Sequence, residues 1–99
     1  PGTSIFTMAG WSLTMACASS RRIRVNMVSP GPTDTEIFKR DATPEQIAAM
    51  RDMLSSKVPI GRMGSAAEIA AAVLFLCSEA ASFVNGVDLF VDGGCVELG

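Results

Sequence analysis

The chain has 99 residues, a formal net charge of −2 and no histidine. This length suffices for one small domain with a modest core. Without histidine, neither a Ser-His-Asp nor a Cys-His nucleophile can be assembled. The three cysteines, Cys17, Cys77 and Cys95, lack the spacing of a zinc site. We expect them to be free thiols in a reducing compartment, which predicts a cytoplasmic location.

Charge and hydropathy argue against two classes of partner. Arg21, Arg22 and Arg24 form one small basic cluster, whereas a nucleic-acid-binding surface needs a broader one. No apolar run approaches the ~20 residues that span a bilayer. No basic segment precedes the apolar residues 1–18, so a signal peptide is not expected either. The sequence therefore predicts no nucleic-acid partner and no membrane span.

The first predicted elements are a helix and a strand. Residues 1–18 are mostly small or apolar, and Ser12–Ala18 fits a helix. Residues 23–28 alternate apolar and polar side chains before becoming fully apolar, which is typical of a strand. The following segment Ser29-Pro30-Gly31-Pro32 should end that strand, because proline lacks an N–H group.

Two helix starts follow. Thr43, Pro44 and Gln46 form a capping box with proline at the first helical position, and this helix should end near Lys57. A second capping box at Ser65-Ala66-Ala67-Glu68 begins a helix expected to reach about Ser78. The apolar face of the second helix is broad, which predicts burial on more than one side.

A second strand is expected at residues 87–91, followed by a turn at Asp92-Gly93-Gly94. One carboxylate does not make a metal site, so this segment is interpreted as a turn only. The segment with Gly61, Arg62 and Gly64 lacks the spacing of a phosphate-binding loop and is also interpreted as a turn. The order strand, helix, helix, strand predicts an α/β fold with two parallel strands.

Two segments together resemble the short-chain dehydrogenase/reductase family, over about residues 21–94. The first is Arg22-Ile23-Arg24-Val25-Asn26-Met27-Val28-Ser29-Pro30-Gly31-Pro32-Thr33-Asp34-Thr35. The second runs from Pro59-Ile60-Gly61-Arg62-Met63-Gly64 through Ala67-Glu68-Ile69-Ala70 to Val91-Asp92-Gly93-Gly94. The resemblance implies that residues 1–99 form a single partial domain. It would be the C-terminal part of an NAD(P)-binding Rossmann domain, with the last two parallel strands and their connecting helices.

The resemblance also implies a cofactor contact after the first of these strands. In the family this loop holds the nicotinamide end of NAD or NADP, which gives the candidate residues Pro30, Gly31, Pro32, Thr33 and Thr35. Gly31 would let a flat ring approach the backbone, the Thr33 backbone would meet the carboxamide, and the Thr35 hydroxyl would bond the carboxamide or the pyrophosphate. The alternative is a plain Pro-Gly turn that stops a strand.

No catalytic residue can be carried over from the family. Its signature is a tyrosine followed four positions later by lysine, and these 99 residues contain no tyrosine. One register places Phe6 and Gly10 at those positions, and another places Thr3 and Thr7 there; neither supplies a suitable acid. The glycine-rich turn that would hold the pyrophosphate is also missing. We therefore predict no dehydrogenase turnover from these residues alone, and weak binding of NAD or NADP or none at all.

Three interpretations stay open at this point. The chain is a fragment of an NAD(P)-dependent alcohol/carbonyl oxidoreductase, a non-catalytic module serving subunit association, or the product of a decayed reading frame. The outer edge of the strand at 23–28 should be unpaired, and Leu74, Phe75 and Phe90 should be exposed. We accordingly expect a homo-oligomer, or a chain that needs the missing N-terminal half.

Overall fold

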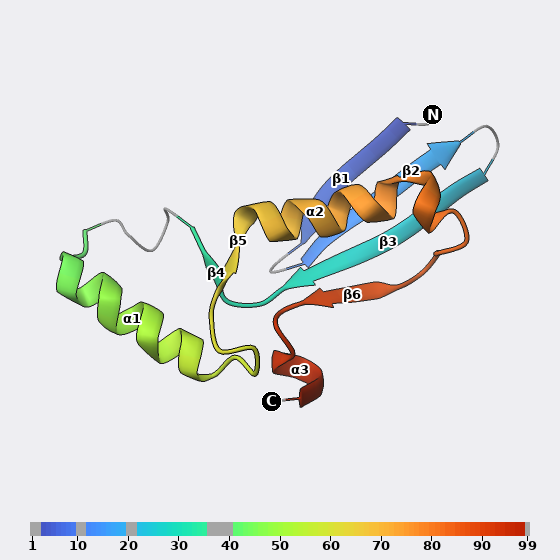
Figure 1. Cartoon of the computed structure of the whole chain (residues 1–99). Helices are drawn as coiled ribbons and strands as arrows, with labels where there is room; N and C mark the ends of the chain where they lie inside the picture. Colours follow the sequence, from blue (N-terminus) through green and yellow to red (C-terminus); the bar gives the residue numbers. More distant parts are fainter. Residues whose placement is uncertain (1–2, 10–11, 20–21, 36–40, 99) are drawn as a thin grey trace.

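A four-stranded mixed sheet organises the computed structural model, which describes residues 3–9, 12–19, 22–35 and 41–98 (Figure 1). In space the strands follow the order β1-β2-β3-β6. Their bounds are Thr3–Ala9 for β1, Ser12–Ser19 for β2, Arg22–Pro30 for β3 and Asp88–Val91 for β6. The sheet therefore joins the first thirty residues of the chain to its last dozen.

The predicted parallel pair is confirmed. β3 and β6 run parallel, with a register from Met27 opposite Asp88 to Pro30 opposite Val91. The crossover between them contains α2, Ala66–Cys77, which lies across one face of the sheet (Figure 1). This is a partial α/β fold of the kind that the sequence predicted.

The helix predicted at Ser12–Ala18 is wrong, because these residues belong to β2. That strand pairs antiparallel with β1 on one side and with β3 on the other. Leu13, Met15 and Ala16 are good helix formers, so the ladder hydrogen bonds on both sides override the local preference of this segment. Gly10, which one register placed at the family's lysine position, lies outside the described residues.

The unpaired outer edge predicted for β3 is also wrong. Leu13 to Ser19 of β2 lie opposite Val28 to Arg22 of β3 and cover that edge along most of its length. The exposed edge of the described sheet is therefore displaced by two strands, to β1.

Both predicted helix starts are confirmed. In α1, Pro44–Ser56, the Thr43 hydroxyl accepts from the Gln46 N–H at 3.2 Å, and the Gln46 side chain accepts from the Thr43 N–H at 2.9 Å. In α2, Ser65 and Glu68 form the same reciprocal pair. Helix α1 contains no buried residue and lies to the side of the sheet (Figure 1).

The core lies between α2 and the sheet. Val28 and Leu76 are fully buried there, and the partly buried apolar side chains around them are Ile69, Val73, Cys77, Val84, Leu89 and Val91. The predicted burial of α2 on more than one side is not found in this chain, because Leu74 remains 70% exposed. The predicted exposure of Leu74, Phe75 and Phe90 is confirmed.

Short elements complete the described chain: β4 Thr33–Asp34, β5 Gly64–Ser65, the 3-10 helix η2 Glu79–Ala81 and α3 Cys95–Leu98. β4 and β5 pair in parallel as a separate two-stranded sheet. Among the residues described, each helix is too short or too polar to cross a bilayer.

Asn26 joins β3 to the segment that leads into β6. Its side chain is 2% exposed, and its amide group donates to the Val84 carbonyl at 3.1 Å. The amide oxygen accepts from the Val87 N–H, also at 3.1 Å. The regular β3–β6 ladder starts at Met27 opposite Asp88, and the bonds of Asn26 extend it by one residue on the N-terminal side. The role of Asn26 in this chain is therefore structural.

We expect Asn26→Ala to lower the free energy of unfolding by about 1–3 kcal/mol, because it removes both hydrogen bonds of a buried side chain and leaves the Val87 N–H without its acceptor, although the Val84 carbonyl keeps its bond from Arg24. Urea unfolding followed by circular dichroism measures this loss. Asn85→Ala is the matched control. The Asn85 side chain accepts from the Val25 N–H at 3.0 Å but is exposed, so water can replace it. Equal losses in the two variants would contradict the role given to Asn26.

Candidate functional site

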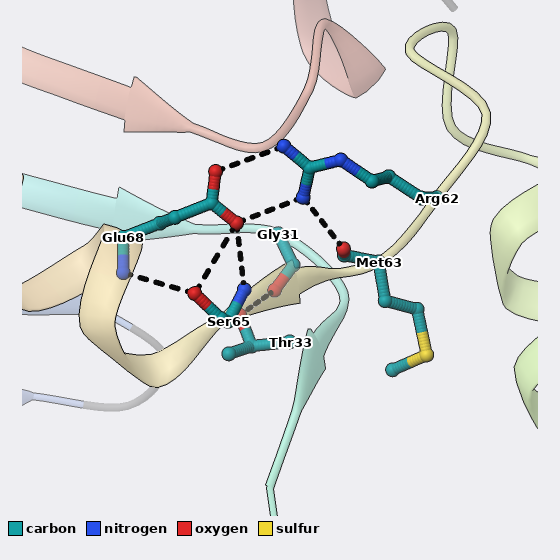
Figure 2. Close-up of polar contacts among 6 residues, drawn as sticks. All are labelled: Gly31, Thr33, Arg62, Met63, Ser65 and Glu68. Atoms are coloured by element: carbon teal, nitrogen blue, oxygen red, sulfur yellow. Dashed lines mark hydrogen bonds and ion pairs between the residues drawn. The ribbon is translucent and has the colours of Figure 1, made fainter.

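The candidate site is the loop 30–35, which leaves the carboxyl end of β3. Two backbone hydrogen bonds hold it: the Gly31 N–H donates to Val91 at 3.0 Å, and the Gly64 N–H donates to Pro32 at 2.9 Å. The Thr33 hydroxyl donates to the Gly31 carbonyl at 2.8 Å (Figure 2). The loop is thus fixed between β6 and β5, at the edge of the sheet where open α/β folds bind ligands.

Gly31 is required by packing inside the chain. A Cβ atom at this position would lie 2.5 Å from the Asp92 Cβ and 2.7 Å from the Asp92 Cα. The family resemblance implied that this glycine lets a flat ring approach the backbone, and that stays a prediction. The structure supplies a different reason, which is the close passage of the turn after β6.

The turn predicted at Asp92-Gly93-Gly94 is confirmed. Gly93 and Gly94 have positive φ angles of 63° and 97°. The Asp92 carboxylate accepts from the Gly94 N–H at 2.8 Å and from the Val96 N–H at 3.1 Å. Asp92 therefore caps the start of α3, and the residues described contain no group of three potential metal ligands.

An apolar groove of about 580 Å³ lies between the loop and α2. Pro30, Thr33 and Thr35 line one wall. The α2 wall consists of apolar or small side chains: Ala66, Ile69, Ala70, Val73, Leu74 and Cys77. The structure therefore brings three of the five predicted site residues to one groove. Pro32 lines a separate, smaller pocket beside Arg62 and Asp92, and Gly31 packs against Asp92.

An ion pair between Arg62 and Glu68 fixes the turn before α2, and the sequence alone did not reveal it. The Arg62 guanidinium donates to the Glu68 carboxylate at 2.8 and 2.9 Å (Figure 2). The same carboxylate accepts from the Ser65 N–H at 3.0 Å. The hydrogen bond from Arg62, followed by that from the Ser65 backbone, lowers the pKa of Glu68 from 4.5 to about 2. The turn leads into β5, and β5 holds the candidate loop through the hydrogen bond from Gly64 to Pro32.

A second ion pair connects the loop to α1. Arg51 Nε lies 3.2 Å from Asp34 Oδ2, and Arg51 Nη2 donates to Asp34 Oδ1 at 3.3 Å. Asp34 stands between Thr33 and Thr35, so this pair orients the loop from the outer side. No local pattern could have revealed it, because the partners are 17 positions apart and belong to different elements.

The family predicted from the sequence is confirmed by comparison with known proteins. The profile of a family described as enoyl-(acyl carrier protein) reductase matches residues 8–96. The match covers most of the chain, and the chain belongs to the short-chain dehydrogenase/reductase family.

Individual relatives match this chain over part of their own length. L-fucose dehydrogenase of Oryctolagus cuniculus is 45% identical over 93 residues, which is 89% of this chain and 32% of that protein. Ligand-free aldohexose dehydrogenase of Thermoplasma acidophilum superposes with a TM-score of 0.67 and 35% identity, over 73% of this chain and 31% of that one. A small-chain dehydrogenase in complex with NADPH superposes with a TM-score of 0.61 and 39% identity. The superposition covers 73% of this chain and 32% of that one. The chain thus spans about a third of these relatives.

Gly31→Ala should lower the free energy of unfolding by about 1–3 kcal/mol, because the added methyl group meets the Asp92 backbone and forces the turn to move. Gly64→Ala is the matched control in the same loop system, since its Cβ would approach nothing closer than the Pro32 oxygen at 3.8 Å. Thermal or urea unfolding of both variants measures the difference. A Gly31 variant as stable as the Gly64 variant would show that Asp92 does not require glycine here.

The Arg62–Glu68 pair should make stability depend on pH in the acid range. Because the pKa of Glu68 is lowered from 4.5 to about 2 on folding, its contribution is present above pH 4.5 and is lost as the pH falls towards 2. Glu68→Gln keeps an acceptor for Ser65 but removes the charge. Urea midpoints of the wild type and this variant should therefore differ at neutral pH and converge in acid. Arg62→Gln should behave likewise, and a difference independent of pH would disprove the linkage.

Proposed function

We propose that this chain supplies the nicotinamide side of the cofactor site in an NAD(P)-dependent oxidoreductase that interconverts an alcohol and a carbonyl. The observation that carries the proposal is the apolar groove at the carboxyl end of β3, with Pro30, Thr33 and Thr35 on its wall. A groove of this kind suits a flat, weakly polar ring, and it occupies the position where open α/β sheets bind nucleotides. The relative that binds NADPH supports the choice of cofactor.

The residues of the loop fit the nicotinamide end in different ways. The Thr33 hydroxyl already donates to Gly31, so Thr33 would offer its backbone to the carboxamide. Thr35 would offer its hydroxyl from the groove wall. Pro30 and the α2 side chains would exclude water from one face of the ring. The cofactor supplies the hydride chemistry when bound, and the chain contributes position and orientation.

Proton transfer and pyrophosphate binding would have to come from outside these 99 residues. The chain contains no tyrosine, and its described residues show no glycine-rich turn between a first strand and a helix. We therefore propose that the segment does not turn over substrate by itself. Because it spans about a third of its relatives, the activity belongs to the complete catalytic unit.

A second candidate function is a non-catalytic module that serves subunit association. The observation that favours it is exposed apolar side chains on both sides of the layer: Leu74 and Phe75 on α2, and Phe90 on the face of β6 opposite to Leu89 and Val91, which pack towards α2. Leu74 is 70% exposed, Phe75 45% and Phe90 41%. Large apolar side chains left exposed in this way are typical of surfaces that further polypeptide covers.

Titration of the isotope-labelled chain with NADPH and with NAD, followed by NMR, tests the cofactor site. We expect weak binding, because the pyrophosphate cradle is absent, with shifts concentrated in residues 31–35 and in the first half of α2. Thr35→Ala should reduce these shifts. Ser82→Ala removes an exposed hydroxyl beyond the far end of α2 and should leave them unchanged.

Two results would contradict the assignment. One is tight binding that Thr35→Ala leaves intact, and the other is a titration in which the amides of residues 31–35 do not respond. The same samples, assayed for oxidation of NADPH with a carbonyl substrate, should show no turnover above the uncatalysed rate.

A further inference from the structure

Asp34 separates the two threonines of the candidate loop and faces a different pocket from theirs. Thr33 and Thr35 line the groove beside α2, whereas Asp34 lines a polar pocket that it shares with Arg51 of α1. Neighbouring side chains of an extended strand lie on opposite sides of the backbone, and Thr33–Asp34 is the strand β4. A contact that fixes the rotation of Asp34 therefore also fixes the side of the loop on which the two threonines lie.

Arg51 holds the Asp34 carboxylate at two points. Its Nη2 donates to Oδ1 at 3.3 Å, and its Nε, an atom that is itself buried, lies 3.2 Å from Oδ2. A planar guanidinium that meets both oxygens restricts the rotation of the carboxylate as well as its distance. A lysine at this position could supply the charge but not the same two-point geometry.

The position of Asp34 along the loop gives this contact its importance for Thr35. The pairing of β4 with β5 ends at Asp34, which lies opposite Ser65. Thr35, whose hydroxyl is proposed to meet the cofactor, follows directly after this last paired residue. The backbone of Asp34 is held by the strand and its side chain by Arg51, so both contacts bear on the orientation of Thr35.

We infer that Arg51 is a positioning residue for the cofactor: through Asp34 it sets the orientation of Thr33 and Thr35 in the groove, and the affinity for NADPH depends on it. The inference rests on the proposed function, because it concerns the same loop. Both partners of the ion pair lie on described elements of this chain, so the contact needs no further polypeptide. Arg51 belongs to the polar pocket and not to the groove wall, so its effect on the cofactor passes through Asp34.

The opposite charges of the pair distinguish positioning from a simple electrostatic effect on NADPH, which is an anion. If the pair acted through charge alone, loss of the Arg51 cation would weaken binding and loss of the Asp34 anion would strengthen it. If Arg51 positions the loop through Asp34, either loss releases the loop and both changes weaken binding. The direction of the effect at Asp34 therefore decides between the two explanations.

Titration of the full 99-residue chain with NADPH, followed by NMR, measures these effects. Arg51→Gln and Asp34→Asn should each raise the Kd about two- to fivefold, the range expected for a partly exposed ion pair. The double variant should bind no more weakly than either single variant, because the second change finds no pair left to break. Arg51→Lys should restore part of the affinity. Asp52→Asn and Lys57→Gln remove the same charges from exposed positions nearby and should leave the Kd nearly unchanged.

Spectra recorded without cofactor separate this inference from the proposed function. In the free chain, Arg51→Gln should shift the amide signals of residues 33–35 while the urea midpoint stays close to that of the wild type, since the pair is partly exposed. If residues 31–35 of the wild type do not respond to NADPH, the proposed function fails, and the spectra of the free chain alone decide whether Arg51 orients the loop. Tighter binding of NADPH by Asp34→Asn, or amide signals of residues 33–35 that Arg51→Gln leaves unchanged, would overturn the inference.

Discussion

The parallel pairing of β3 with β6 is the interaction on which the other features depend. It joins segments about 60 positions apart, and Asn26 extends it through side-chain bonds to Val84 and Val87, in the segment that leads into β6. The pairing brings the turn at Asp92 against Gly31 and places Val28 beneath Leu76 of α2. The candidate loop has its position only because both strands end at the same edge of the sheet.

The loop is held from three directions, and each contact has a different physical basis. Backbone bonds from Gly31 and Gly64 fix its path. The ion pair between Asp34 and Arg51 connects it to α1. The network of Arg62, Ser65 and Glu68 fixes the turn that carries β5 (Figure 2). Such support would favour the cofactor binding proposed for this loop, because a site that is already ordered loses less entropy when it binds its ligand.

The groove and the exposed apolar surface have a common origin in the incomplete α/β layer. Helix α2 covers the sheet with one face, while Leu74 and Phe75 on its other side remain exposed. Parallel sheets are normally covered on both faces. The chain spans about a third of its relatives, and among its described residues one wall of the groove comes from the loop and the other from α2.

The sequence by itself determined the elements whose signals are local. The capping boxes at Thr43 and Ser65, the strand before Pro30 and the turn at Asp92 depend on neighbours within a few residues, and the resemblance to the family rested on the residues of two segments. Only the tertiary structure decided the conformation of Ser12–Ala18, which became a strand because both of its neighbours offer ladder bonds. It also decided why Gly31 has no side chain, since the atom it would meet belongs to Asp92. Contacts across so many residues leave no periodicity in a sequence, and folding alone brings the partners together.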